Sequence, residues 1–150
     1  MNNEQDIYFM NLALQEAKKA FNLGEVPVGA VLVKDNHVLS VGYNLRETKK
    51  NALAHAEIVA ISNACKALGS WRLDGCTIYV TLEPCPMCTG AIINSRITRI
   101  VFGTPDAKAG CCGSVANLLA MEFNHRPVLT GGILKEDCAN ILQDFFRALR

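Results

Sequence analysis

The chain has 150 residues, of which 50% are hydrophobic and 19% are charged, and this composition excludes an intrinsically disordered protein. Its 15 Lys and Arg against 14 Asp and Glu leave a net charge of +1, which does not by itself indicate a nucleic-acid partner. No apolar run approaches the ~20 residues of a membrane-spanning helix, and the polar N-terminus does not have the pattern of a secretory signal. We therefore expect one cytoplasmic domain over residues 1–150 without a membrane segment.

Hydrophobic periodicity and turn residues predict helices and strands that alternate along most of the chain. Helices are expected where apolar residues recur every three or four positions, and strands where short β-branched runs occur. The expected helices span residues 7–21, 54–68, 85–94, 115–121 and 136–149. The expected strands span residues 26–33, 37–43, 76–82, 99–102 and 127–130. An initial hairpin followed by alternating strands and helices predicts an α/β fold, with three α/β/α layers built around a mixed five-stranded sheet.

Particular residues mark the expected ends of these elements. Asp6 is the expected N-cap of the first helix, and Gly69 is a favourable stop for the second. Asp35 and Asn36 both tolerate positive φ, so they predict a two-residue turn between the first two strands. Pro86 stands at an early position of the third helix, where a missing amide N–H costs little.

The seven cysteines do not predict a disulfide framework, because the number is odd and the chain is long enough to fold without cross-links. Cys65, Cys76 and Cys138 fall within expected helices or strands, and we predict that all three are buried apolar packing. Cys111 and Cys112 fall in a loop of small residues, where we expect them to be compact, polarisable filler.

Three other positions have the residue types and spacing of a metal site. His55 stands at the start of the second expected helix. Cys85 and Cys88 stand three residues apart at the start of the third, so both thiols can face one point. Three protein ligands and one open position are typical of a catalytic zinc, whereas a structural zinc is closed by four ligands. We therefore predict one Zn²⁺ per subunit, bound by these three residues.

Glu57 lies two residues after His55 and can point into the same pocket without binding the metal. Zinc lowers the pKa of a bound water from 15.7 toward about 7, and Glu57 is placed to accept a proton from that water. Taken alone, a histidine at a helix start is more often a cap, and a C-x-x-C pair can be a redox pair. The combination with Glu57 favours a catalytic metal site.

Together the two motifs have the form H-x-E followed by P-C-x-x-C, which is the general signature of zinc nucleobase deaminases, and the deamination chemistry is taken from that known class. Over nearly its whole length the sequence also resembles the bacterial-type tRNA-specific adenosine deaminases, which have the cytidine deaminase-like fold. The matching segments are 25–31 (EVPVGAV), 42–44 (GYN), 81–88 (TLEPCPMC), 95–97 (SRI), 101–103 (VFG), 124–125, 132–133 and 144–147, with Asp106, Lys108, Gly113 and Ser114.

This resemblance implies a homodimer that converts adenosine to inosine at the wobble position of a tRNA anticodon. It implies that Glu57 is the proton shuttle and delivers the proton to a ring nitrogen and to the leaving amine. By the same resemblance, Asn44 would hydrogen-bond the flipped base, and Val28 and Leu82 would form walls of the pocket. The backbone amide of Ala56 would stabilise the charge that develops near the attacked carbon.

The resemblance also implies contacts with the anticodon loop outside the base pocket. Asp106, Lys108 and Phe146 would lie near the nucleotides that flank the target base. Phe145 and Phe146 are neighbours, and we expect Phe145 in the core and Phe146 at a rim. The basic loop at 46–50 precedes the metal site in sequence, so we expect it to border the pocket and to contact phosphate.

Three alternatives remain open from the sequence. A guanine or other free-base deaminase would share the same metal ligands and glutamate, but would need no RNA-facing loop. A cytosine-specific deaminase is disfavoured, because the segments outside the metal site resemble the adenosine group. A non-catalytic, zinc-stabilised RNA-binding subunit is disfavoured by Glu57, because a purely structural site has no use for a carboxylate beside an open metal position.

Overall fold

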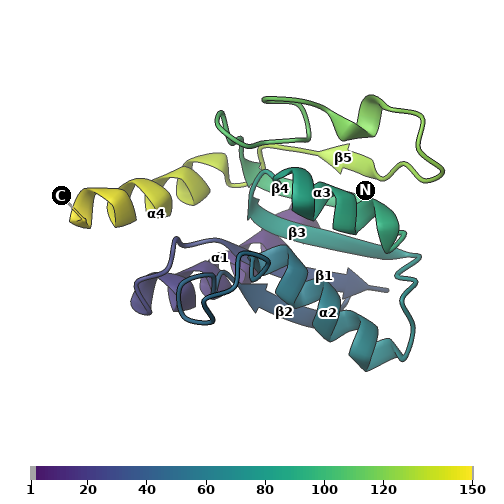
Figure 1. The fold of residues 1–150 in the computed structure, drawn as a ribbon, viewed down its shortest axis with the longest axis horizontal. Helices are drawn as coiled ribbons and strands as arrows, with labels where there is room; N and C mark the ends of the chain where they lie inside the picture. The colour runs from purple at the N-terminus through teal and green to yellow at the C-terminus, as the bar shows by residue number, and fades with distance from the viewer. Residues whose placement is uncertain (1–2, 150) are drawn as a thin grey trace.

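The computed structural model describes residues 3–149 and contains a five-stranded sheet with the strand order β2-β1-β3-β4-β5 (Figure 1). The strands are β1 (Gly29–Lys34), β2 (His37–Tyr43), β3 (Cys76–Leu82), β4 (Arg99–Thr104) and β5 (Val128–Thr130). The helices are α1 (Asn3–Asn22), α2 (Ala56–Leu68), α3 (Pro86–Asn94) and α4 (Lys135–Ala148), with a short 3₁₀ helix η1 (Leu118–Ala120). Strand β1 is antiparallel to β2 and β3, whereas β3, β4 and β5 are parallel to one another.

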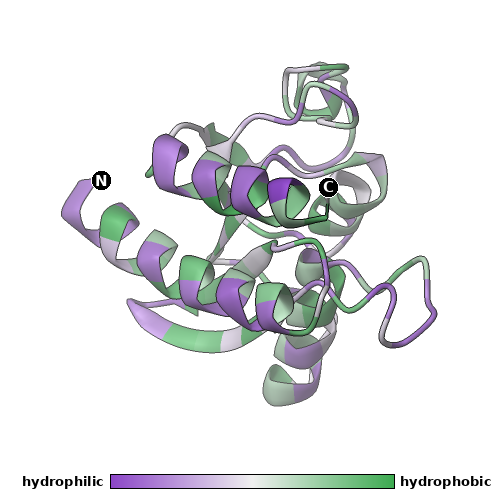
Figure 2. Ribbon diagram, turned by 90° about the vertical axis from the view of Figure 1, so that its left-hand side faces the viewer, coloured by the Kyte–Doolittle hydropathy of each residue, from purple (hydrophilic) through white to green (hydrophobic). Residues whose placement is uncertain are grey.

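Helices cover both faces of this mixed sheet, which confirms the predicted three-layer α/β/α architecture. Helices α2 and α3 lie in front of the sheet in Figure 1, and α1 lies behind it. Helix α4 packs beside α1 against β3 and β4, and Figure 2 shows the two helices side by side with mixed hydrophilic and hydrophobic residues. No helix within residues 3–149 is long and apolar enough to cross a membrane.

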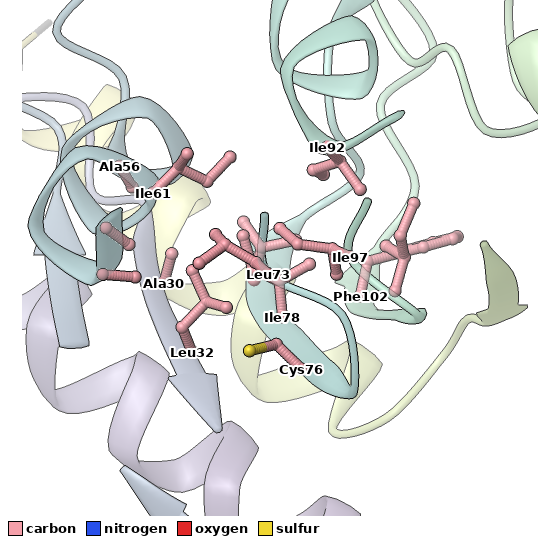
Figure 3. Close-up of a cluster of buried hydrophobic side chains, with 14 of the residues drawn as sticks. Ala30, Leu32, Ala56, Ile61, Leu73, Cys76, Ile78, Ile92, Ile97 and Phe102 are labelled. Atoms are coloured by element: carbon pink, nitrogen blue, oxygen red, sulfur yellow. The ribbon is translucent and has the colours of Figure 1, made fainter. Parts of the chain in front are cut away.

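The period of two along the strands divides the core into two clusters. Ala30 and Leu32 of β1, together with Ile78 of β3, face the cluster beneath α2 and α3 (Figure 3). Val31 and Tyr79 point to the opposite face, into the cluster beneath α1 and α4. Because successive strand residues alternate between faces, β1 and β3 contribute to both clusters and are buried on both sides.

The turn and stop residues behave as predicted. Asp35 and Asn36 adopt φ values of 51° and 63° between β1 and β2. Gly69 ends α2 in the left-handed conformation, and Pro86 occupies the first turn of α3. The prediction that Asp6 is an N-cap is wrong, because α1 begins at Asn3 and the Asp6 side chain is buried within it.

Asp6 instead joins α1 to the sheet. Its carboxylate accepts hydrogen bonds from Arg99 at 2.7 and 2.8 Å and from the Tyr79 hydroxyl at 2.9 Å. The Arg99 guanidinium lowers the pKa of Asp6, against the opposing effect of burial. The charge that would favour a helix N-terminus is therefore used in a buried ion pair between layers.

Helix α1 begins four residues before the predicted start at residue 7. Two other predicted elements differ from the structure for local hydrogen-bonding reasons. Strand β1 begins at Gly29 and not at residue 26, because the Val28 N–H bonds to the carbonyl of Val26 within the preceding loop. Residues 115–121 form only η1, because the N–H groups of Val115 and Leu118 donate to the carbonyls of Gly110 and Cys111. These bonds tie the segment back to the preceding loop and leave no room for an α-helical ladder.

The cysteine predictions hold at four of the five positions outside the metal motif. Cys76 and Cys138 are fully buried, and Cys111 and Cys112 are buried beside the candidate site. Cys65 is only partly buried near the C-terminal end of α2, where its Sγ lies 3.9 Å from the carbonyl oxygen of Trp71. Cys65 packs against the core cluster as an apolar side chain, but it is less buried than predicted.

Candidate metal and substrate site

The site lies at the edge of the sheet where β3 and β4 end. Leu82, the last residue of β3, pairs with Thr104 at the end of β4. Because β1 is antiparallel to β3, its first residue Gly29 lies at this same edge, and so does Tyr43 at the end of β2. Helices α2 and α3 both begin after segments that leave this edge, so their first turns meet there.

Gly42 allows α2 to start close to the sheet. A Cβ atom at this position would lie 2.4 Å from the carbonyl oxygen of Ala56 and 2.7 Å from the amide nitrogen of Ala60. Both distances are shorter than any ordinary contact, so only glycine permits this approach. The first turn of α2 is thereby held against β2, next to His55.

His55, Cys85 and Cys88 converge on one point between the starts of α2 and α3. The Nδ1 atom of His55 lies 3.6 Å from the Sγ atoms of both cysteines. All three ligand atoms lie within 4.8 Å of one another. The sequence placed these residues at two helix starts, and the tertiary structure brings those starts together.

The donor set fits a tetrahedral zinc ion. A zinc bound to nitrogen at about 2.0–2.1 Å and to thiolate at about 2.3 Å places those two atoms about 3.5–3.6 Å apart. The nitrogen–sulfur distances of this site agree with that separation. Two thiolates and one imidazole also match zinc in ligand type and would balance its double positive charge.

The three ligands are also arranged to favour a thiolate. Hydrogen bonding from Cys88 and from His55 lowers the pKa of Cys85 to about 4. The hydrogen bond with Cys85 in turn raises the pKa of His55, and it raises the pKa of Cys88 together with burial. Cys85 is the N-cap of α3, where the positive end of the helix dipole adds to this stabilisation.

Glu57 is a buried carboxyl group in the first turn of α2, with 4% of its surface exposed. It lines the same pocket as His55 and Cys85. Burial raises its pKa to about 7, which is the range that suits a group that both accepts and donates protons at neutral pH. Its position and environment are those expected of an acid–base group beside a metal.

The pocket has a volume of about 220 Å³ and contains most of the residues that the sequence assigned to substrate binding. The predicted pocket residues that line it are Val28, Asn44, Ala56, Leu82 and Asp106. Asn44 is held in place by two hydrogen bonds: its Nδ2 donates to the carbonyl of Val26 at 3.2 Å, and its Oδ1 accepts from the Arg46 N–H at 3.1 Å. An asparagine amide has two N–H groups and two acceptor lone pairs, so one of each remains for a ligand.

Two predicted substrate residues lie outside this pocket lining. Lys108 is exposed, and its N–H donates to the Asp106 side chain at 3.0 Å. Phe146 lies on α4 with 46% of its surface exposed, whereas Phe145 is buried. This agrees with the prediction that Phe145 lies in the core and Phe146 at its rim. Both Lys108 and Phe146 therefore lie at the surface, where only a ligand larger than one base could touch them.

Sequence reasoning missed the roles of Glu25 and Glu83, which are 1% and 2% exposed. Glu83 lines the pocket, and Glu25 lies next to the pocket residue Val26. Hydrogen bonds from the neighbouring loops lower the pKa of both carboxyls although burial alone would raise it. A charged residue beside an apolar, strand-forming run was the available signal, because such a residue is buried only when it is hydrogen-bonded.

Comparisons with known proteins agree with this geometry. The family model described as MafB19-like deaminase matches residues 2–150. A tRNA-specific adenosine deaminase of Bacillus subtilis (strain 168) is 53% identical over 147 residues, which cover 97% of this chain and 91% of that relative. A solved structure from a study of A-to-I editing by tRNA deaminases at the wobble position has a TM-score of 0.88 and 43% identity, and covers 90% of this chain and 99% of that one.

A more distant structure shows how far the fold itself extends. The guanine deaminase from Nitrosomonas europaea has a TM-score of 0.76 and 21% identity, covering 93% of this chain and 83% of that chain. At that identity the likeness establishes the fold alone. By contrast, the deaminase family model matches nearly the whole chain, and the Bacillus subtilis relative is 53% identical over 97% of it. This chain therefore belongs to the family of tRNA-specific adenosine deaminases.

Proposed function

We propose that this chain, as one deaminase domain over residues 1–150, catalyses the zinc-dependent hydrolytic deamination of adenosine to inosine at the wobble position of tRNA. The observation that carries the proposal is the convergence of His55, Cys85 and Cys88 beside the buried carboxyl of Glu57 in a single pocket. Metal ligands with an adjacent acid–base group suit hydrolysis at a base, and a redox or purely structural site has no need of Glu57.

His55, Cys85 and Cys88 would hold the zinc, which supplies an acidified water as nucleophile when it is bound. Glu57 accepts a proton as the water oxygen forms a bond with C6 of adenine, and then delivers it to the ring nitrogen beside C6. Glu57 next transfers the second proton of the water to the exocyclic amine. The C6–N bond breaks, ammonia leaves, and the C6 carbonyl of inosine remains.

The pocket suits a single base. Its volume of about 220 Å³ is below the about 300–1,000 Å³ of sites for drug-sized ligands. Val28 and Leu82 offer apolar walls for the flat faces of a purine. The remaining N–H and lone pair of Asn44 provide a donor and an acceptor for the base edge, and Ala56 lines the pocket together with its neighbour Glu57.

An anticodon loop suits the surroundings of the pocket. Its bases are already unstacked, so little energy is needed to turn one outward. Arg46 lines the pocket, and Lys49 and Lys50 are exposed on the same loop, where they can meet phosphates. Asp106 at the lining, with Lys108 and Phe146 farther out, could contact the flanking nucleotides.

We further propose that the enzyme is a homodimer in the cytoplasm. Several large apolar side chains around η1 and the edge strand β5 are at least half exposed, namely Val115, Met121, Phe123 and Val128. Exposed apolar residues of this number near a sheet edge favour burial against a second subunit. Size-exclusion chromatography with light scattering would measure the mass of the protein in solution. The mass of a monomer at micromolar concentration would contradict the dimer.

The deciding experiment is an incubation of the purified protein with an anticodon stem-loop that carries a wobble adenosine, with zinc quantified on the same sample. We expect inosine in the RNA and about one zinc per chain. A parallel incubation with free guanine, monitored for ammonia, tests the free-base alternative. The likeness to guanine deaminase does not support that alternative, because 21% identity establishes only a shared fold. Absence of inosine at full zinc occupancy would overturn the proposed function.

A further inference from the structure

Two loops border the pocket, and each is fastened to a buried glutamate. The first loop follows β2 and carries Asn44 and Arg46, which both line the pocket. The second loop follows β4 and carries Asp106 and Ala109, which also line the pocket. Glu25 contacts the first loop, and Glu83 contacts the second.

Glu83 organises the second loop through both of its carboxylate oxygens. Its Oε1 accepts from the Asp106 N–H at 3.0 Å and from the Ser114 hydroxyl. Its Oε2 accepts from the N–H groups of Cys112 at 3.0 Å and Ser114 at 3.1 Å. Gly110 leaves space for this carboxylate, because a Cβ atom there would lie 2.4 Å from the Glu83 Cδ and Oε2.

Glu25 organises the first loop in the same way. Its Oε1 accepts from the Glu47 N–H at 3.0 Å, and its Oε2 accepts from the Thr48 N–H at 2.5 Å. Arg46, immediately before these donors, uses its own N–H to bond the Asn44 side chain at 3.1 Å. The position of the arginine at the pocket and the orientation of the asparagine therefore both depend on how Glu25 holds the loop.

We propose that Glu25 and Glu83 are paired positioning residues that hold the two loops bordering the pocket in the arrangement that binds the nucleotides around the target base. This inference rests on the proposed function. It assigns substrate affinity to two carboxyls that lie behind the loop residues, whereas the chemical step stays with Glu57. A carboxylate suits this task because both its oxygens only accept hydrogen bonds, and here both face backbone N–H groups.

The test replaces each carboxylate by its isosteric amide. In both Glu25→Gln and Glu83→Gln, whichever way the amide turns, its NH₂ group faces a backbone N–H. Glu25→Gln loses one backbone hydrogen bond, and Glu83→Gln loses one when the NH₂ group replaces Oε1 and two when it replaces Oε2. We expect KM for the stem-loop to rise about tenfold, the size typical for loss of one charge-assisted hydrogen bond, with kcat within about twofold of wild type. Zinc content should stay at the wild-type value.

Glu16→Gln is the matched control. Glu16 is also a buried glutamate, at 7% exposure, but it lies on α1 and pairs with Lys19 at 2.8 Å, apart from both loops. The same chemical change there should leave KM and kcat unchanged. A rise in KM in all three variants would assign the effect to general destabilisation and would overturn the proposal.

The salt dependence of RNA binding distinguishes the role of Glu25 from the role of Glu83. Replacing Arg46 with alanine should reduce the slope of log affinity against log salt by about 0.7, the value for one phosphate contact on a single strand. Glu25→Gln should reduce the slope in the same direction, and it should have little further effect when Arg46 is already alanine. Glu83→Gln should add to the Arg46 change instead of being absorbed by it, since the Glu83 loop carries Asp106 and Lys108 and does not hold Arg46. Full additivity of the Glu25 and Arg46 changes would contradict the proposed coupling.

Amide hydrogen exchange tests the loop contacts independently of catalysis. Exchange should accelerate at Glu47 and Thr48 in Glu25→Gln, and at Cys112 and Ser114 in Glu83→Gln. Faster exchange with an unchanged KM would overturn the role in substrate binding, and unchanged exchange would overturn the anchoring itself. If the wild-type protein forms no inosine, the proposed function fails, and the exchange data still decide whether the glutamates hold the loops.

If either amide variant fails to fold, Thr48→Val and Ser114→Ala remove a partner hydroxyl and keep the buried carboxylates. Both residues are exposed, so neither change disturbs the core. A rise in KM of about twofold or more, without loss of zinc, would support the proposal. Wild-type KM in both partner variants would overturn it.

Discussion

Glu57 combines burial, a raised pKa and a position beside the three candidate metal ligands. We expect Glu57→Gln to lower kcat for inosine formation by at least about 100-fold, because the amide cannot accept and return a proton. Zinc content should be unchanged, as measured by emission spectrometry on the purified variant. A variant that keeps its turnover would eliminate the proton-shuttle role, and one that loses its zinc would make Glu57 part of the metal site.

At the scale of the helices, two glycines predict opposite effects of the same substitution. A Cβ atom at Gly42 would collide with the α2 backbone at 2.4 Å, whereas Gly90 in the middle of α3 has open space around it. Gly42→Ala should lower the free energy of unfolding by about 1–3 kcal/mol through overpacking. Gly90→Ala should raise it by about 0.5–1 kcal/mol, because alanine restricts the unfolded chain and favours the helix.

Urea unfolding of both variants at pH 7 measures these differences. Because α2 starts beside His55, Gly42→Ala should also lower the affinity for zinc, which a competition assay with a chromogenic chelator would detect. Gly90→Ala is the control for the chemical change itself. If Gly42→Ala were as stable as wild type, the close packing of α2 on β2 would not determine the position of the histidine.

At the scale of the whole molecule, the ion pair of Asp6 and Arg99 connects α1 to the sheet and predicts a specific dependence of stability on pH. The pKa of Asp6 is lowered in the folded state, so its contribution is fully present above the unfolded value of about 3.9 and is lost as pH falls through the folded value. Asp6→Asn should cost about 3–5 kcal/mol at pH 7, because Arg99 is left buried without its partner.

The difference in unfolding free energy between wild type and Asp6→Asn should therefore shrink as the pH is lowered from 7 toward 2. Denaturant melts at several pH values measure this difference directly. A difference that stays constant over the whole range would show that the carboxylate charge does not contribute, and that packing alone connects α1 to β4.

The proposed zinc site should also affect the stability of the whole molecule, because His55 at the start of α2 and Cys85 and Cys88 at the start of α3 would bind the same ion. Removal of zinc by a chelator should lower the melting temperature by about 10 °C. Zinc at a free concentration about a thousand times its Kd stabilises the folded state by about 4 kcal/mol, and each kcal/mol shifts the melting temperature of a domain of this size by about 2–4 °C. Scanning calorimetry with and without chelator measures the shift, and added zinc should reverse it. An unchanged melting temperature in a zinc-free sample would mean that the site is not coupled to the fold.

The layers and strand pattern could be predicted because hydrophobic periodicity is a local property. The alternation in β1 and β3 and the turn at Asp35 and Asn36 follow from residues within a few positions of one another. At Asp6 the sequence was misleading because a distant partner decided the outcome. Asp6 has the residue type of an N-cap, but Arg99 is 93 positions away and takes its charge into the core.

The sequence by itself determined which chemistry to propose for the site, because the residue types and the spacing of His55, Glu57, Cys85 and Cys88 are local features of the chain. Only the tertiary structure decided which other side chains share that pocket. It selects Arg46 from the basic loop for the lining, leaves Lys108 outside the lining, and buries Glu25 and Glu83 behind the two loops. The reason is physical: loop positions depend on hydrogen bonds between segments far apart in the chain, and no local pattern records which segments will meet.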